Sequence, residues 1–237
     1  MAKLGVNVDH IATLRQARRG KFPDPVYAAG ICERAGCGSI VAHLREDRRH
    51  INDNDVKRFK KEVKTRFNLE MSIAPAIVDI ACRVKPHQAT LVPEKRQELT
   101  TEGGLDIAEN KNKIKKAVGR LSGAGIEVSL FIDPDIRQIK AAPLVGAKIV
   151  ELHTGRYADS KTALQKGGEL KKIVKAAYFA KSLGLTVCAG HGLDYDNVRP
   201  IAAISGIYEL NIGYSIICRS VFAGLEAAVR QMLELVK

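Results

Sequence analysis

The stretch Ala35-Gly-Cys-Gly-Ser-Ile-Val-Ala-His-Leu-Arg-Glu-Asp-Arg-Arg-His50 places a glycine turn, an apolar run and a dense group of charges in one line. Glycine takes the left-handed conformation at no steric cost, so this turn is typical of the end of a helix that leads into a strand. The apolar residues of 39–44 predict that strand. The residues from His43 to His50 include two histidines, three arginines and two acids, which packing alone does not require. A strand that ends in such a group predicts a site that binds an anion and transfers protons.

The same order of helix, glycine turn and strand recurs along the chain. Similar turns precede apolar runs at Gly125, Gly146 and Gly184. Hydrophobic periodicity predicts eight strands, at residues 4–9, 39–44, 69–73, 89–92, 127–132, 148–153, 186–189 and 209–212. It predicts eight regular helices, at residues 25–34, 53–66, 76–84, 111–122, 135–144, 162–183, 195–203 and 216–236.

This alternation predicts one α/β domain over residues 1–237, because no linker or shift in composition interrupts it. The predicted architecture is a closed parallel (β/α)8 barrel, the TIM barrel, with an extra short helix near 10–19. A doubly wound sheet is the alternative, but the first strand lacks the Gly-x-Gly-x-x-Gly turn of a dinucleotide-binding fold. Residues 93–104 exceed an ordinary loop in length and predict a lid that contacts a ligand.

The composition favours a globular protein with a solvated basic surface. The chain has 237 residues, of which 46% are hydrophobic, and a net charge of +12. Much of the positive charge lies in predicted helices such as 55–66, where Val56, Phe59 and Val63 form an apolar stripe and leave the lysines facing solvent. Aromatic residues are only 5% of the chain, which disfavours base stacking, so we expect no nucleic-acid partner. A basic RNA-binding protein is the non-enzymatic alternative.

Targeting and redox features predict a cytoplasmic protein. No apolar run approaches the roughly 20 residues that span a bilayer, so we expect no membrane association. The first residues lead directly into a predicted strand, without the long apolar region of a signal peptide. The five cysteines include no Cys-x-x-Cys pair, which predicts buried and reduced thiols.

Catalytic groups of such barrels lie at the carboxyl ends of the strands. Polar residues gather in the predicted strands or directly after them, at Asn7, Asp9, His10, His43, Arg45, Glu70, Glu151, His153 and His191. A carboxylate inside a parallel strand, such as Glu70, is costly unless paired, and desolvation raises its pKa toward that of a useful base. Glu70 could instead pair with a lysine inside the barrel, and His153 could be a core histidine bonded to the backbone. His87 precedes its strand and is predicted to be structural.

Two later segments are typical of phosphate binding. Ala189-Gly-His-Gly192 closes the seventh predicted strand, and Asn211-Ile-Gly-Tyr-Ser215 joins the eighth strand to the last helix. Small residues there let backbone N–H groups approach an anion at a helix amino terminus. A tight turn with a helix cap at Ser215 is the simpler alternative.

A second anion site is predicted on the other side of the barrel mouth, at Arg45 and His50 with Thr100 or Thr101. Two such sites predict two phosphorylated substrates or one bisphosphate. The acids and histidines could also ligate zinc in a hydrolase, but the first strand lacks a His-x-His pair, and we therefore predict no metal.

Eight segments, taken in order, run through nearly the whole chain: Gly5-Val-Asn-Val-Asp-His-Ile-Ala-Thr-Leu-Arg15, His43-Leu-Arg-Glu-Asp-Arg-Arg-His50, Asn68-Leu-Glu-Met71, Val92-Pro-Glu-Lys-Arg-Gln-Glu98, Thr100-Thr-Glu-Gly-Gly-Leu-Asp106, Glu151-Leu-His-Thr-Gly155, Ala189-Gly-His-Gly-Leu193 and Glu209-Leu-Asn-Ile-Gly213. Together they closely resemble the pyridoxine 5′-phosphate synthase family. The resemblance implies a TIM barrel that condenses 1-deoxy-D-xylulose 5-phosphate with 3-amino-2-oxopropyl phosphate, giving pyridoxine 5′-phosphate, phosphate and water in vitamin B6 biosynthesis. It also implies that no metal or organic cofactor is needed and that the chain forms a homo-octamer.

The resemblance further implies a role for each site residue. The proton acceptors are expected to be His43 and Glu70, the proton donor His191, and the transition-state stabiliser Glu151. The amino-ketone phosphate is expected to contact Asn7, Arg18, Gly192, Gly213 and Tyr214. The deoxyxylulose phosphate is expected to contact Asp9, His10, Arg45, His50 and Thr100. The family commonly has histidine where this chain has Tyr214, so the phosphate contact differs in detail if the side chain makes it.

Overall fold

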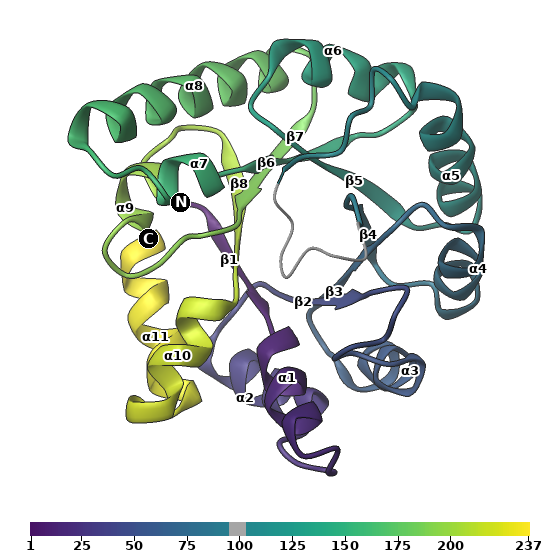
Figure 1. Cartoon of the computed structure of the whole chain (residues 1–237), viewed down its shortest axis with the longest axis vertical. Coiled ribbons are helices and arrows are strands. Elements are labelled where there is room, and N and C mark those ends of the chain that lie inside the picture. Colours follow the sequence, from purple (N-terminus) through teal and green to yellow (C-terminus); the bar gives the residue numbers. More distant parts are fainter. Residues whose placement is uncertain (95–102) are drawn as a thin grey trace.

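The computed structural model, which describes residues 1–94 and 103–237, is a closed barrel of eight parallel strands in sequential order (Figure 1). The predicted fold class is therefore confirmed, and the doubly wound sheet is excluded. The strands are β1 (Lys3–Asn7), β2 (Ser39–Leu44), β3 (Arg66–Met71), β4 (Gln88–Leu91), β5 (Glu127–Ile132), β6 (Ile149–His153), β7 (Thr186–Gly190) and β8 (Ile207–Ile212). The helices of the described residues are α1 (Asp9–Ala17), α2 (Pro25–Ala35), α3 (Asp53–Glu62), α4 (Pro75–Val84), α5 (Lys111–Gly123), α6 (Ile136–Leu144), α7 (Gly155–Ala158), α8 (Ala163–Ser182), α9 (Val198–Ala202), α10 (Tyr214–Ala223) and α11 (Leu225–Val236).

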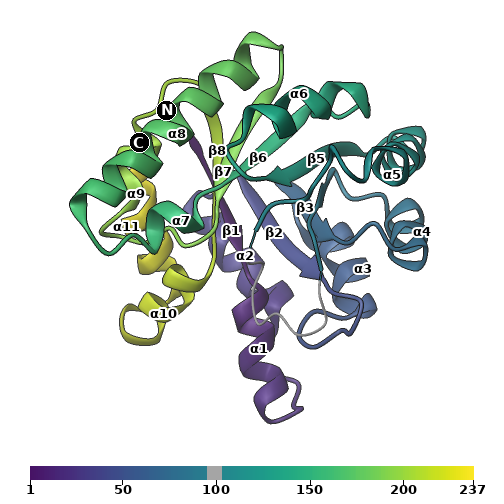
Figure 2. The same cartoon turned by 45° about the horizontal axis from the view of Figure 1, so that its top comes forward.

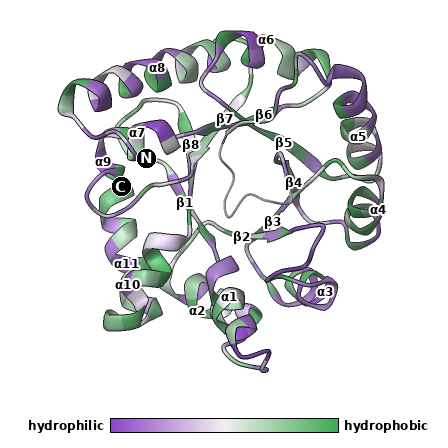
Figure 3. Ribbon diagram, viewed as in Figure 1, coloured by the Kyte–Doolittle hydropathy of each residue, from purple (hydrophilic) through white to green (hydrophobic). Residues whose placement is uncertain are grey.

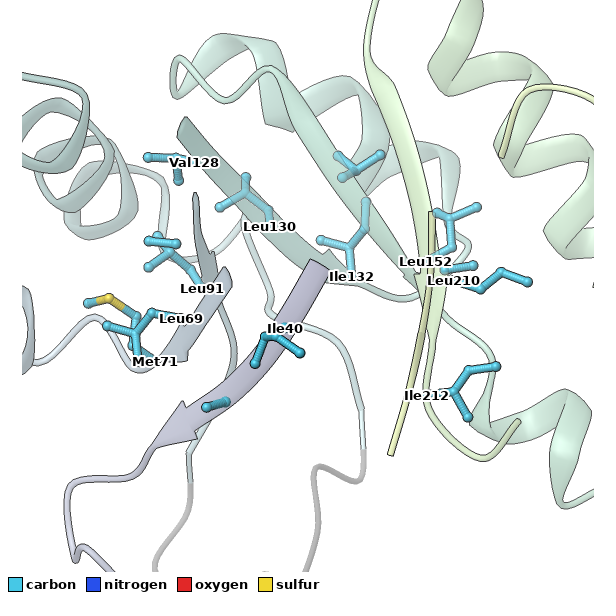
Figure 4. Close-up of a cluster of buried hydrophobic side chains, with 14 of the residues drawn as sticks. Ile40, Leu69, Met71, Leu91, Val128, Leu130, Ile132, Leu152, Leu210 and Ile212 are labelled. Atoms are coloured by element: carbon cyan, nitrogen blue, oxygen red, sulfur yellow. The ribbon is translucent and has the colours of Figure 1, made fainter. Parts of the chain in front are cut away.

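Alternate residues of each strand face opposite sides of the barrel wall. In β3, Leu69 and Met71 are fully buried in the apolar layer beneath the helices, part of which is drawn in Figure 4. Asn68 and Glu70 alternate with them and face the barrel interior. Because β2 and β3 are aligned with His43 beside Glu70, the register places both at the carboxyl end.

The predicted glycine turns are confirmed. Each of the four follows a helix and has a left-handed backbone, with φ values of 104° at Gly36, 82° at Gly125, 91° at Gly146 and 76° at Gly184. A side chain is strained at such angles, so glycine is the residue that lets each helix end turn sharply into the next strand.

Three predicted helices differ from the structure. The helix predicted over 216–236 is two helices, α10 and α11, because Gly224 between them has φ 80° and ψ 149°. The helix predicted over 53–66 ends at Glu62, since Val63 is extended and Arg66 already begins β3. The helix predicted over 195–203 is shortened to α9. The breaks fall at residues with low helix propensity, because glycine (Gly224) and β-branched residues such as Val63 are poor helix formers.

The basic helix surface is solvated, as predicted. In α3 the side chains of Val56 and Phe59 are buried, while Lys57 and Lys61 are exposed. Figure 3 shows hydrophilic residues on the outer faces of the helices that surround the barrel. No helix among residues 1–94 and 103–237 combines the length and apolar character needed to cross a bilayer.

The cysteines agree with prediction in redox state but not fully in burial. All five are free thiols, and Cys32, Cys37 and Cys188 are buried. Cys82 is partly exposed, however, and Cys218 is exposed on α10. The prediction that all are buried was therefore wrong for these two, because a residue within an apolar helix can still lie on its outer face.

The short helix predicted after the first strand is α1, which projects from the edge of the barrel in Figure 2. It is anchored by Arg15, whose guanidinium donates to both carboxylate oxygens of Asp55 on α3, at 2.8 and 2.7 Å. Arg15 also donates to the His50 carbonyl oxygen at 2.9 Å. This ion pair is nearly buried, with side chains 9% and 2% exposed, and it joins the first helix to the loop that carries His50.

We expect Asp55→Asn to lower the free energy of unfolding by about 3 kcal/mol, because it leaves the Arg15 charge buried without its partner. Glu226→Gln is the control, since it removes an exposed partner of Arg230 and should cost at most about 0.5 kcal/mol. Urea denaturation of the three proteins measures both effects. Equal stability of the two variants would contradict the anchoring role of the buried pair.

Candidate active site

A cavity of about 1120 Å³ opens at the carboxyl ends of the strands. Twelve of the fourteen residues predicted for the site line it. They come from β1, β2, β3 and β6, from the starts of α1 and α10, and from the loops after β2, β7 and β8: Asn7, Asp9, His10, His43, Arg45, His50, Glu70, Glu151, His191, Gly192, Gly213 and Tyr214. The predicted convergence on one rim of the barrel is thus observed. Of the other two, Arg18 is exposed at the carboxyl end of α1 and does not line this cavity. Thr100, like Thr101 and most of the predicted lid, lies outside the described residues.

Glu70 is the acidic group at the base of the cavity. The predicted alternative, a lysine paired with Glu70, is not observed among the described residues. Instead, Oε2 of Glu70 accepts a long hydrogen bond of 3.4 Å from the Asn7 amide. Burial raises the pKa of Glu70 well above its ordinary value, and the negative charges of Glu151 and Asp9 act in the same direction. A carboxyl group with a raised pKa can both accept and return a proton near neutral pH.

Asp9 joins the ends of β1 and β2. One of its oxygens accepts the backbone N–H of His43 at 2.8 Å, and the other accepts the Asn7 amide at 2.9 Å. Asn7 in turn accepts the Asp9 backbone N–H at 2.8 Å. These bonds fix the orientation of both side chains before any substrate arrives.

His43 is held by a residue that the sequence interpretation did not select. Its Nε2 lies 2.9 Å from Oε1 of Glu94, which follows β4. The second Glu94 oxygen accepts the backbone N–H of Glu46 at 3.0 Å. The only sequence signal for Glu94 was its place in the motif that begins at Val92, because no local pattern shows that the end of β4 lies against the end of β2.

His191 occupies the opposite wall of the cavity in a strained backbone conformation, with φ 81°. Its carbonyl oxygen accepts the Thr154 hydroxyl at 2.6 Å, which helps to hold this conformation. Burial lowers the pKa of His191 to about 4, and the nearby His153, whose ring centroid is 5.0 Å away, acts in the same direction. The imidazole is therefore neutral at neutral pH in the ligand-free protein.

The two polar residues of β6 are both inside the barrel, as their spacing predicted. Glu151 is 2% exposed and accepts the Asn211 amide at 2.7 Å. Burial raises the pKa of Glu151, and the Glu209 charge adds to the effect, although the bond from Asn211 opposes it. His153 Nδ1 pairs with Asp133 at 3.0 Å, so the alternative of a backbone-bonded core histidine is wrong. His87, as predicted, is structural: its Nδ1 accepts the Phe67 backbone N–H at the amino end of the barrel.

The loops after β7 and β8, which were predicted to bind phosphate, both reach the cavity and contain closely packed glycines. A Cβ atom at Gly192 would lie 2.6 Å from the Ala158 Cβ, and one at Gly213 would lie 2.8 Å from the Asn7 Cβ, so only glycine fits at either position. Gly213 precedes the amino terminus of α10, whose N–H groups favour an anion. The cap at Ser215 is not observed, because its hydroxyl donates to the Leu193 carbonyl oxygen at 2.8 Å.

Arg45 and His50, which were predicted for a second anion site, both line the cavity, and Arg45 is buried. His50 Nδ1 accepts the Ile51 backbone N–H at 2.8 Å, which leaves Nε2 for a ligand. Arg49 also lines the cavity, together with further residues that were not predicted individually: Thr13, Asp194, Tyr195 and Arg219. Arg49 belongs to the opening charged segment, but Arg219 lies on α10 with its guanidinium 4.2 Å from the Tyr195 ring centroid, which no local motif indicates.

A metal ion could be held by Asp9, His43 and Glu70, because one ligand atom of each lies within 4.8 Å of those of the other two. The donor set nevertheless fits a metal poorly. Both Asp9 oxygens already accept hydrogen bonds. Burial, which raises the pKa of Glu70, opposes the charged form that a cation would need.

A closed (β/α)8 barrel whose carboxyl-end cavity brings together carboxylates, histidines and glycine-containing loops defines a barrel enzyme. The family model described as "Pyridoxal phosphate biosynthesis protein PdxJ" matches residues 4–237. The chain therefore belongs to the PdxJ family, as its motifs indicated.

Curated relatives agree with this assignment. The pyridoxine 5′-phosphate synthase of Geotalea uraniireducens is 57% identical over 237 residues, which cover 100% of this chain and 99% of that protein. The enzyme of the same name from Photobacterium profundum is 58% identical, over 97% of this chain and 94% of that one. Among solved structures, KGPDC from Streptococcus mutans shares the fold with a TM-score of 0.68 at 12% identity, covering 100% of this chain and 97% of that one.

We expect acid to destabilise the native protein through His191. Because the folded-state pKa of about 4 lies below the unfolded value of 6.5, the unfolded chain binds more protons between these two values. Stability is therefore lost as pH falls through this window, by about 2 kcal/mol at pH 5. Urea denaturation of the parent and of His191→Asn at pH 7.5 and pH 5 tests this, since asparagine tolerates the left-handed backbone. The stability difference should shift in favour of the variant at pH 5, and an unchanged difference would contradict the assignment.

Proposed function

We propose that the chain is a pyridoxine 5′-phosphate synthase that condenses 1-deoxy-D-xylulose 5-phosphate with 3-amino-2-oxopropyl phosphate. Family membership and the names of its relatives support this reaction. The observation that carries the proposal is the meeting of His43, Glu70, Glu151 and His191 in one cavity, which is also lined by Arg45 and His50 and by Gly192 and Gly213. Two phosphorylated substrates need two such ends, and fixing both lowers the entropic cost of joining them.

The reaction requires several proton transfers at different atoms. The amine attacks a ketone to form an imine, a proton leaves carbon, phosphate is expelled, and ring closure with loss of water gives the aromatic product. We assign proton acceptance to His43 and Glu70, whose strands are adjacent. We assign stabilisation of the transition state to Glu151 and proton donation to His191. None of these steps requires a metal or an organic cofactor, so we propose that the enzyme uses neither.

Proton donation by His191 depends on the bound substrates in this proposal. In the ligand-free protein its imidazole is neutral, because burial and His153 hold its pKa at about 4. Phosphate dianions in the cavity bring negative charge next to the ring, and negative charge favours the imidazolium. In this proposal, substrate binding therefore favours protonation of His191, the proton donor.

The amino-ketone phosphate is assigned to the cradle formed by Gly192, Gly213 and the start of α10, with Asn7 beside it. Tyr214 is 68% exposed and its ring lies against His10, with the centroids 5.1 Å apart. We infer that its backbone N–H, rather than its hydroxyl, contacts the phosphate, which explains why tyrosine can stand where the family commonly has histidine. The deoxyxylulose phosphate is assigned to Asp9, His10, Arg45 and His50, with Thr100 as predicted.

The direct test supplies both phosphorylated substrates to purified protein that has been treated with a chelator. Pyridoxine 5′-phosphate should appear, as measured by its absorbance. Activity that is lost with the chelator and restored by zinc would favour the hydrolase-like metal centre instead. No product with or without metal would overturn the proposal.

Glu70→Gln should keep both substrates bound but lower kcat by at least about 100-fold, because the amide cannot accept the proton. Turnover assays and calorimetric titration of each substrate measure the two effects separately. Glu209→Gln is the matched control, since Glu209 is also buried inside the barrel but does not line the cavity. The control should stay within a few-fold of the parent, whereas near-normal turnover of Glu70→Gln would remove Glu70 from the mechanism.

We also propose that the chain forms a homo-oligomer, as the family resemblance implies for an octamer, and that it acts in the cytoplasm. Helices α1, α2 and α10 pack together around Ile11, Ala28 and Ile217. Their outer surfaces carry exposed apolar side chains, namely Leu14, Tyr27, Val221 and Phe222. An apolar surface of this kind favours contact with a second copy of the chain. Arg18 is exposed at the end of α1, so its proposed phosphate contact depends on how copies assemble around this helix.

Light scattering after size-exclusion chromatography should give eight times the chain mass of 25.9 kDa. Val221→Asp should lower this mass, because it places a charge in the proposed interface. Leu164→Asp on α8 is the control, since Leu164 is also an exposed apolar residue but lies away from α1, α2 and α10. A monomeric parent protein would contradict the proposal.

A further inference from the structure

The contact between Glu94 and His43 has the geometry of a carboxylate that orients a catalytic histidine. The Glu94 side chain is 6% exposed, and its Oε1 lies 2.9 Å from Nε2 of His43. Its other oxygen accepts the Glu46 backbone N–H at 3.0 Å, so the carboxylate cannot rotate without losing a bond. His43 is held at its backbone as well, by Asp9.

This contact selects the tautomer of His43. An ionised carboxylate only accepts hydrogen bonds, so the proton of a neutral His43 ring lies on Nε2. The lone pair is then on Nδ1, which becomes the basic nitrogen. Histidine–carboxylate pairs in other enzymes fix the ring in the same way and stabilise the imidazolium that forms when the histidine accepts a proton.

The electrostatics of Glu94 agree with an ionised partner. Burial alone would raise the pKa of Glu94, but the hydrogen bond with His43, the His43 charge and the Glu46 N–H together hold that pKa below its ordinary value. The other charged or titratable groups around His43 come from several elements: Asp9 at the start of α1, Arg45 and His50 after β2, and Glu70 on β3. Among the described residues, Glu94 is the acid whose carboxylate bonds the imidazole itself.

We propose that Glu94 is a positioning residue for the synthase reaction, which holds His43 in the Nε2-protonated form and stabilises the imidazolium produced when Nδ1 accepts a proton. The proton moves from substrate to Nδ1 and later leaves from the same atom, so Glu94 stays ionised throughout. This inference rests on the proposed function for its kinetic consequences, but its tautomer assignment does not depend on activity.

Glu94→Gln keeps the shape and a carbonyl oxygen that can accept from Nε2, but removes the charge. We expect kcat to fall on the order of 100-fold, with KM changed by less than about threefold. The acid limb of the kcat/KM profile should move to lower pH by about one unit, because the imidazolium has lost its anionic partner. Glu94→Ala should lower kcat further, since it also releases the ring. A merely structural link between β4 and β2 would lower activity without moving the pH profile, and that result would overturn the proposal.

Glu46→Gln is the matched control. It removes a negative charge from the same loop and keeps the backbone N–H that Glu94 accepts, but its side chain bonds Ser72 rather than His43. Its turnover and pH profile should match those of the parent. A shift as large as that of Glu94→Gln would mean that general loop charge, not the carboxylate–imidazole contact, sets the profile.

A measurement on the parent protein tests the tautomer even if the Glu94 variants fail to fold. Nitrogen-15 NMR of the histidine rings, with His43 assigned by comparison with His43→Gln, should show the Nε2–H form at neutral pH. A proton on Nδ1 would overturn the inference. If the parent makes no pyridoxine 5′-phosphate, the proposed function fails, whereas the NMR result still decides the tautomer.

Discussion

The parallel register of β2 and β3 is the constraint on which the site depends. It sets His43 beside Glu70, and the alternation of strand side chains then turns both toward the barrel interior. A shift of one residue would send both outward beneath the helices and bring Leu69 and Met71 inward. The apolar layer opposes such a shift, because these two side chains are fully buried in it. The apolar packing outside the barrel wall thus holds the His43 and Glu70 side chains in the interior.

The same enclosure concentrates acidic groups in a small desolvated volume. Glu70, Glu151 and Asp9 lie close enough that their charges, added to burial, raise the pKa of Glu70. Two of these acids have amide partners: Asn7 at the end of β1 bonds Asp9 at the start of α1, and Asn211 on β8 bonds Glu151 on β6. Such an arrangement costs stability in the empty protein but provides carboxyl groups that exchange protons near neutral pH.

Two histidine–carboxylate pairs lie at or beside the cavity. His43 with Glu94 lies near the Arg45 side, and His153 with Asp133 lies next to His191. The two sides differ in their electrostatics, because the Glu94 carboxylate bonds the His43 ring whereas burial and His153 lower the pKa of His191. This difference fits the proposed roles, in which His43 accepts a proton and His191 donates one.

The sequence by itself determined the order of strands and helices, the glycine turns and the polar residues at strand ends, since each is written in residues that are adjacent along the chain. The prediction missed the end of the helix near Val63 and the break at Gly224, although a β-branched residue and a glycine mark these two positions. Only the tertiary structure decided that Glu94 bonds His43 and that Arg18 lies outside the cavity. These outcomes depend on barrel closure and register, which bring together residues 51 positions apart in the case of His43 and Glu94. No local sequence pattern specifies a contact between residues so far apart in the chain.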